Sequence, residues 1–150
     1  MDMPDIRMLV PHAGPMVLLD RVISIDEESL CAEVTIRADS LFCGAEGVGT
    51  WVGIEYMAQA IAAHAGHAAF LCGEPVKIGF LLGSRRYACE RPAFAVGSVL
   101  RVHVTRLLVA ENGLGSFDCR IEDQGGVAAT ATVSVFLPAN ADEFLKGSVE

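Results

Sequence analysis

Residues 49–64, GTWVGIEYMAQAIAAH, most constrain the fold of this chain, because they are typical of a helix that is apolar on nearly every side. A helix that is hydrophobic all round is normally buried. Its only strongly polar side chains before the final histidine are Glu55 and Gln59. A spacing of four residues places these two on one face, one turn apart. The pattern therefore predicts a core helix with a single polar stripe.

Glu55 is the acid of this stripe, and a carboxylate in apolar surroundings is costly to keep ionised and unpaired. We expect it to have a hydrogen-bonding partner, to retain its proton near neutral pH, or both. A carboxyl group in such a position is suited to proton transfer. The alternative, which the residues leave open, is a structural acid that satisfies a buried donor.

The helical stretch approaches the ~20 apolar residues that a membrane span needs. However, Glu55, Gln59, His64 and His67 all lie inside it, and ionisable groups are costly within a bilayer. We therefore expect no membrane partner and interpret the helix as the centre of a soluble domain.

The chain has 150 residues, which is the size of one domain. Its formal net charge of -8 argues against general binding to nucleic acid or to anionic membranes. A hydrophobic fraction of 52% is high for a monomer and indicates that apolar surface is buried between subunits.

Five cysteines are scattered along the chain without a CxxC pair. They indicate neither a disulfide framework nor a metal site, and no ligand spacing points to an organic cofactor. The first residues lack the basic start and apolar run of a secretory signal. We expect a cytoplasmic protein without a metal or cofactor.

Alternating apolar residues predict strands on both sides of the helix. Before it we expect a pair of antiparallel strands, at 16–25 and 30–37. After it we expect four more, at 77–88, 99–109, 115–122 and 127–137. Two strands, one long helix and four strands fit an α+β domain in which an antiparallel sheet wraps around a central helix. We assign residues 1–138 to this single domain and 139–150 to a polar C-terminal tail, where Phe144 and Leu145 could dock.

Three motifs carry a resemblance to a known family, and together they cover almost the whole chain. They are LVPHAGPMVLLDRV at 9–22, GIEYMAQA at 53–60, and the run from Gly79-Phe80 to Arg91-Pro92 with Val96-Gly97-Ser98 after it. In this order they resemble the hotdog-fold 3-hydroxyacyl-acyl-carrier-protein dehydratases of fatty-acid synthesis. The likeness is closest to a divergent branch found in aryl-polyene-type biosynthetic clusters.

The resemblance implies a dimeric hotdog fold and a dehydratase acting on 3-hydroxyacyl thioesters carried by acyl carrier protein. It also implies that a second hotdog protein can act beside this one, so the dimer is either a homodimer or a heterodimer. One departure is important: the family's catalytic histidine lies fourteen residues before the helix acid, and here that position is Leu41. Either the base has moved, or the activity has changed.

Dehydration needs a base for the C2 proton, an acid for the leaving hydroxyl and donors to the thioester oxygen. Glu55 is the expected acid, and by family likeness a backbone amide at the helix start, Thr50, is the expected donor. Gln59 would orient Glu55, although a hydrogen bond to nearby backbone is as good an account. Thr50 is also expected as an N-cap or first-turn residue.

His12 is the base that we favour, because it lies on a stiff loop between two prolines and inside a family motif. A purely structural histidine there stays open, as does a position across a dimer interface. The other histidines are poorer candidates: His64 points away from Glu55 around the helix, His67 lies ~18 Å along the axis, and His103 is on a strand.

Arg85, Arg86 and Arg91 form the one concentrated positive patch, and we expect it to receive an acidic carrier protein or its phosphopantetheine arm. A solvated strand surface is the competing interpretation. Two rival functions also remain: an acyl thioesterase that uses Glu55 alone, and a non-catalytic hotdog subunit that supports an active partner.

Overall fold

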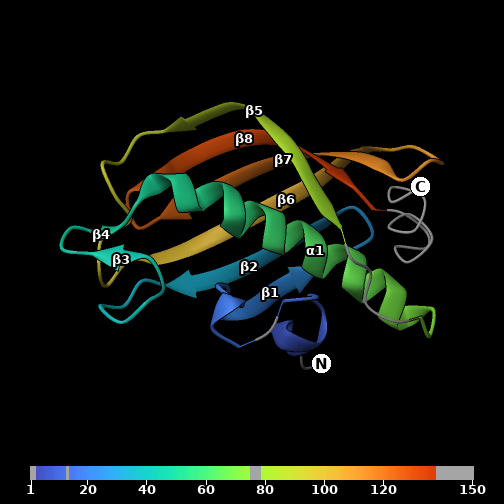
Figure 1. Cartoon of the computed structure of the whole chain (residues 1–150), viewed down its shortest axis with the longest axis horizontal. Coiled ribbons are helices and arrows are strands. Elements are labelled where there is room, and N and C mark those ends of the chain that lie inside the picture. The colour runs from blue at the N-terminus through green and yellow to red at the C-terminus, as the bar shows by residue number, and fades with distance from the viewer. Residues whose placement is uncertain (1–2, 13, 75–78, 138–150) are drawn as a thin grey trace, which may run out of the picture.

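The computed structural model describes residues 3–12, 14–74 and 79–137. Figure 1 shows one long helix, α1 (Gly53–Leu71), lying across one face of a curved antiparallel sheet. The six strands of this sheet are β1 (Arg21–Ile25), β2 (Ser29–Thr35), β5 (Phe80–Cys89), β6 (Val99–Val109), β7 (Leu114–Asp123) and β8 (Gly126–Phe136). The hotdog architecture expected from the sequence is confirmed.

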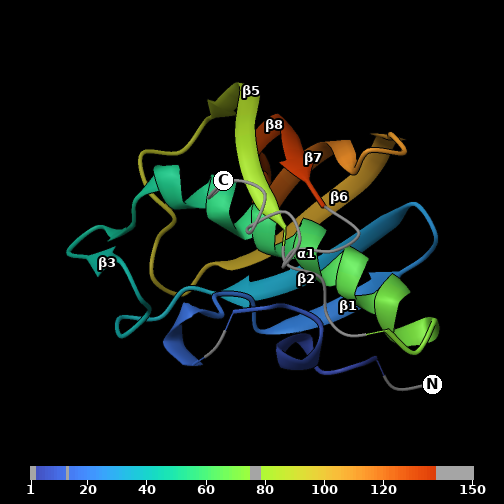
Figure 2. The same ribbon diagram turned by 45° about the vertical axis from the view of Figure 1, so that its right-hand side comes forward.

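The strand order in the sheet is β1-β2-β6-β7-β8-β5. The two strands that precede the helix, β1 and β2, therefore lie at one edge, and β5 forms the opposite edge. Every neighbouring pair is antiparallel. Figure 2 shows that α1 crosses one face of the sheet and that its C-terminal end extends beyond the strands. The predicted pairing of the first two strands is correct, with Val22 opposite Ala32.

Alternation along the strands buries one face against α1 and leaves the other to polar side chains. On α1 the residues that pack inward include Tyr56, Met57, Ala60 and Ile61, all at 2% exposure or less. From the sheet, the inward residues are Leu30, Ala32, Val34, Leu100, Val102, Val104, Phe117, Cys119, Ile121, Ala131, Val133 and Val135.

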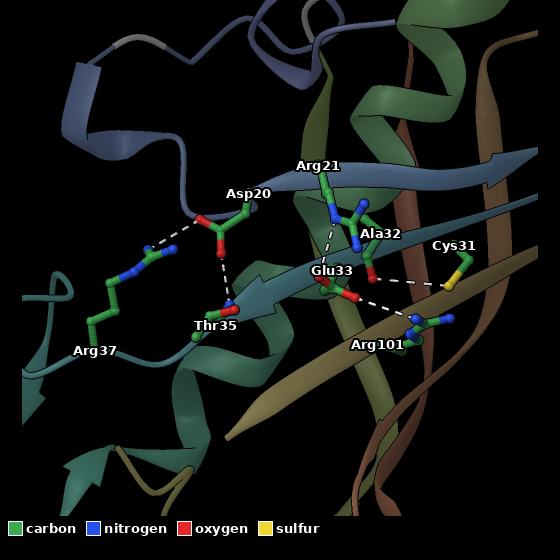
Figure 3. A network of polar contacts seen from close by, with 8 residues as sticks. All are labelled: Asp20, Arg21, Cys31, Ala32, Glu33, Thr35, Arg37 and Arg101. Carbon is green, nitrogen blue, oxygen red and sulfur yellow. Dashed lines mark hydrogen bonds and ion pairs between the residues drawn. The ribbon is translucent and has the colours of Figure 1, made fainter. Parts of the chain in front are cut away.

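The opposite face of the sheet carries charged pairs. Figure 3 shows the Glu33 carboxylate between two arginines, with Arg21 Nε at 3.1 Å and Arg101 Nη2 at 3.4 Å. Farther along, His103 Nε2 lies 2.7 Å from Glu122 Oε1. The expected strand histidine is therefore part of a surface ion network, away from α1.

The helix begins and ends through backbone geometry. A 3-10 turn, Thr50–Val52, leads into α1 without any side-chain cap, so Thr50 is a first-turn residue and the N-cap role is not observed. At the other end Gly73 adopts a φ of +72°. The Gly73 and Glu74 N–H groups then bond to the carbonyls of Phe70 and Ala69, which closes the last turn in a Schellman arrangement.

Two expectations need correction. Residues 16–20 are not part of the first strand, since a 3-10 helix covers Gly14–Met16 and β1 begins only at Arg21. The loop before the helix also contains a small hairpin that the pattern did not predict, made of β3 (Cys43–Gly44) and β4 (Gly47–Val48). Two further expectations lie outside the described residues: positions 77–78 of the strand expected at 77–88, and the tail at 139–150 with Phe144 and Leu145.

Candidate active site

Glu55 lies in the first turn of α1 and is less buried than the sequence indicated. Its side chain is 36% exposed in the single chain. A carboxylate in the first turn of a helix interacts favourably with the helix dipole. The expected buried acid is thus a half-buried one, which one chain alone does not seal from solvent.

His12 is the residue that the fold brings to Glu55. Its Nε2 atom lies 3.5 Å from Glu55 Oε1, and its side chain is 28% exposed. The other ring nitrogen, Nδ1, is buried and meets no hydrogen-bond partner among the described residues. Nε2 is therefore the ring nitrogen that faces Glu55.

Gln59 connects the acid to the loop that carries the histidine. Its side chain is fully buried, at 0% exposure. The Gln59 amide group donates to the Met16 carbonyl at 2.7 Å and to Glu55 Oε1 at 3.2 Å, and its oxygen accepts from the Leu18 N–H at 2.9 Å. Gln59 thus forms hydrogen bonds both to Glu55 and to the backbone of the preceding loop, the two kinds of contact that were considered for it.

The segment before His12 is fixed against the other end of the helix. It contains the 3-10 helix Ile6–Met8, and Leu9 is 1% exposed. A Cβ atom on Gly66 would lie 1.8 Å from the Leu9 carbonyl oxygen, so only glycine allows this crossing. Gly66 and Gln59 therefore hold the His12 loop on both sides.

His12 and Glu55 open into a cavity of about 190 Å³ between α1 and the sheet. The remaining walls are almost wholly apolar, and come from the helix, the segment before His12, and the strands β5 and β8. These residues are Pro11, Ala58, Ile61, Ala62, Gly79, Leu81, Val135 and Leu137. The sequence pattern does not mark them as cavity walls, although Ala58 and Ala62 follow Glu55 at helical spacing.

Thr50 does not line this cavity. Its carbonyl accepts hydrogen bonds from the Gly53 N–H and from the Tyr87 hydroxyl, which fix the turn before α1. A Cβ atom on Gly53 would lie 2.3 Å from that hydroxyl oxygen. Burial raises the pKa of Tyr87, so its hydroxyl stays protonated and available to donate.

Leu41, at the position of the family's histidine, is 38% exposed and lines a different groove, of about 520 Å³. Asp20 and Arg37 line the same groove. The Asp20 carboxylate accepts from the Thr35 N–H at 2.7 Å and lies 3.5 Å from Arg37 (Figure 3). Tyr56 forms part of its wall, and burial raises the pKa of this phenol to about 12. Within one chain, residue 41 thus lies apart from the Glu55 cavity.

The predicted cationic patch divides into two parts. Arg91 forms a two-pronged pair with Asp123, with both N–O distances at 2.9 Å, and this pairing lowers the pKa of the Asp123 carboxyl. Arg85 and Arg86 are exposed on the edge strand β5, and neither forms an ion pair with another described residue. Arg86 has a left-handed backbone, with a φ of +56°.

His64 and His67 lie outside the cavity and line another groove, as expected from the helical rotation for His64 and from the distance along the axis for His67. His64 Nε2 is 3.1 Å from the carbonyl oxygens of both Asp26 and Glu27. Burial lowers the pKa of His64, so the neutral ring with a proton on Nε2 is favoured. This histidine fastens the β1–β2 turn to the helix.

In the described part of the chain, no three His, Cys, Asp or Glu side chains are grouped closely enough to hold a metal ion. None of the helices in that part is both long and apolar enough to cross a membrane.

Comparison with known proteins relates this site to a family. A family model described as ApeP-like, ApeP dehydratase, matches residues 4–146. A chain of the dehydratase heterocomplex ApeI:P from Xenorhabdus doucetiae is 32% identical, with a TM-score of 0.90 over 99% of this chain and 100% of that one. A search of proteins with curated functions finds no significant match.

Other similar structures are far more distant in sequence. A hypothetical thioesterase with coenzyme A from Streptococcus pneumoniae is 12% identical, with a TM-score of 0.62 over 78% of this chain and 84% of that one. The PaaI protein of the E. coli phenylacetic acid degradation operon is 18% identical, with a TM-score of 0.60 and 79% of each chain covered. At these identities the likeness is one of fold.

Proposed function

The chain belongs to the ApeP-like dehydratase family, and we propose that it removes water from 3-hydroxyacyl thioesters held by an acyl carrier protein, in fatty-acid or polyene-type biosynthesis. The observation that carries this proposal is the 3.5 Å contact between His12 Nε2 and Glu55 Oε1 at the polar end of an apolar cavity. A base and an acid side by side suit a substrate whose reacting centre is polar and whose tail is fatty.

His12 acts as the base and Glu55 as the acid. The Nε2 atom of His12 takes the proton from C2 of the thioester, and the electron pair of that C–H bond forms the C2–C3 double bond. The C3–O bond breaks, and the proton of Glu55 leaves with the hydroxyl group as water. General acid–base catalysis of this kind contributes about 10²–10⁴-fold to a rate.

After one turnover His12 carries an extra proton and Glu55 lacks one. Because the two atoms are 3.5 Å apart, a small approach returns the proton from His12 to Glu55 directly. The Gln59 amide donates to the same Oε1 atom and keeps the carboxyl group oriented during this exchange. The dyad is thus reset without a separate proton donor.

The thioester oxygen gains charge when the C2 proton leaves, and N–H donors stabilise it. We assign this role to the Thr50 N–H, on the family likeness and on the positive dipole at the helix start. Since Thr50 does not line the cavity of the single chain, this role needs a partner that brings the substrate to the helix start.

A second hotdog protein is the partner that we propose. His12 and Glu55 remain 28% and 36% exposed, so one chain leaves the reacting groups open to water. Strand β5 is an edge of the sheet and presents Leu81 and Leu82, which are 46% and 57% exposed, next to this site. The similar protein from Xenorhabdus doucetiae is part of a dehydratase heterocomplex. A partner that pairs with β5 would cover the cavity.

Arg85 and Arg86 are the residues that we propose for contact with the acidic carrier protein, because they are exposed and without ion pairs in the described structure. Arg91 contributes to this surface less directly, since Asp123 already neutralises its charge. Attraction between opposite charges would speed the encounter more than it tightens the complex.

One experiment separates the candidate functions. The protein, alone and mixed with a hotdog partner, is given a 3-hydroxyacyl carrier protein, and mass spectrometry follows loss of water and loss of the acyl group. Water loss that requires Glu55 and His12 supports the proposal. Loss of the acyl group identifies a thioesterase instead. Water loss that needs the partner but neither residue identifies a non-catalytic subunit, which the leucine at position 41 would explain.

A further inference from the structure

The two walls of the cavity carry side chains of different size, and this difference affects which acyl chains the cavity accepts. Glu55, Ala58 and Ala62 occupy positions i, i+3 and i+7 of α1 and so share one face of the helix. All three line the cavity. Ile61 of the same helix also lines the cavity, but at the two positions that share the face of Glu55 the helix presents only methyl groups.

The opposite wall is formed by large apolar residues. Val135 of β8 is 4% exposed, and Leu137 follows that strand. A Cβ atom on Gly79 would lie 2.5 Å from Leu137 Cδ2, so Gly79 lets Leu137 pack closely against it. The two alanines thus face a tightly packed apolar wall.

The polar pair at one end fixes the direction of the substrate. C2 and C3 must lie at His12 and Glu55, and the polar pantetheine arm favours solvent. The apolar tail is then driven into the apolar part of this cavity, over Ala58 toward Ala62. Ala62 lies seven residues past Glu55, about 10 Å along the helix axis at 1.5 Å per residue.

We propose that Ala58 and Ala62 determine specificity, with Ala62 limiting the length of the acyl chain; this inference rests on the proposed dehydratase function. The cavity of about 190 Å³ corresponds to about six volumes of liquid water at ~30 Å³ each, which is room for a chain of roughly as many carbon atoms. An isobutyl group in place of the Ala62 methyl group would fill the far part of this space. The substrate class is therefore a medium-length 3-hydroxyacyl thioester.

The test compares Ala62→Leu with wild type, in the protein as assembled with its hotdog partner, on 3-hydroxybutyryl and 3-hydroxydecanoyl pantetheine. The expected result is a loss of about tenfold or more in kcat/KM for the decanoyl substrate and little change for the butyryl substrate. Ala68→Leu is the matched control, because Ala68 is an exposed residue of the same helix outside the cavity, and it should leave both values unchanged.

An equal loss on both substrates, or no loss on either, would overturn the role of Ala62. If Ala62→Leu does not fold, Ala62→Val is held to the same criterion. If the wild-type assembly removes water from neither substrate, the proposed function fails. The length limit is then tested separately by calorimetric binding of the two 3-hydroxyacyl pantetheine amides, where Ala62→Leu must weaken only the longer one.

Discussion

His12 Nε2 and Glu55 Oε1 lie 3.5 Å apart in a single chain, one on an N-terminal loop and the other in the first turn of the central helix. The loop reaches this position because it is fixed at two points of the helix, by the side chain of Gln59 and by the absence of one at Gly66.

Gln59 should be needed for both stability and rate. In Gln59→Leu, the Leu18 N–H and the Met16 carbonyl lose their partner, and each unsatisfied buried group costs about 1–3 kcal/mol. We expect a lower free energy of unfolding by denaturant and a lower kcat. Gln59→Glu should also lose activity, since a carboxylate oxygen would replace the donor that faces Glu55 and the Met16 carbonyl. Wild-type stability and kcat in both variants would contradict the bridging role.

Gly66 should tolerate no side chain. In Gly66→Ala the added Cβ meets the Leu9 carbonyl oxygen at 1.8 Å, and backbone atoms cannot move aside as a flexible side chain can. We expect destabilisation of about 1–3 kcal/mol or more, together with lost activity, because the displaced segment carries His12. The measurements are chemical denaturation and the water-loss assay. Gly44→Ala is the control, since the nearest atom to its Cβ would be at 3.9 Å.

These contacts show what the sequence could predict and what it could not. The period of two in the strands and the apolar helix predicted the sheet and its central element correctly. The predicted start of the first strand was wrong, because the backbone of Met16 and Leu18 bonds to Gln59, a residue distant in sequence, and not to a neighbouring strand. Local pattern carries no information about such a contact.

The candidate site shows the same division. The unusual acid and the stiff histidine loop could be identified from single segments, and the structure brings them together. The exposure of Glu55 and the ion pair between Arg91 and Asp123 could not be identified in this way, since both depend on segments that meet only in the folded chain. The apolar walls of the cavity come from β5 and β8, and nothing in their alternation distinguishes them from ordinary core positions.

His64 should make stability depend on pH. Burial lowers its pKa in the folded chain below the ordinary value of 6.5, so the unfolded chain binds this proton more readily. The stabilisation is therefore complete above about pH 6.5 and is lost as the pH falls toward the folded pKa. In His64→Gln, the unfolding free energy should change less steeply with pH in this window. Some slope should remain, because burial also lowers the pKa of His103. An unchanged slope would contradict the assignment.

The arginines should separate by role. Arg91→Ala removes a two-pronged, partly buried pair with Asp123 and should lower the melting temperature. Arg85→Glu with Arg86→Glu should leave the melting temperature nearly unchanged but slow association with the acyl carrier protein, with the larger effect at low salt. Stopped-flow binding and thermal unfolding measure the two effects. Carrier binding at the wild-type rate in the double variant would place the carrier elsewhere.

The most direct test is the rate of water loss from a 3-hydroxyacyl carrier protein in His12→Ala and Glu55→Gln, measured by mass spectrometry with the hotdog partner present. Loss of a general base or acid should lower kcat by about 10²–10⁴-fold in each variant, and the double variant should be little worse than either, because the two residues act as a unit. Unfolding midpoints should confirm that both variants are folded. Dehydration at the wild-type rate in His12→Ala would contradict the account.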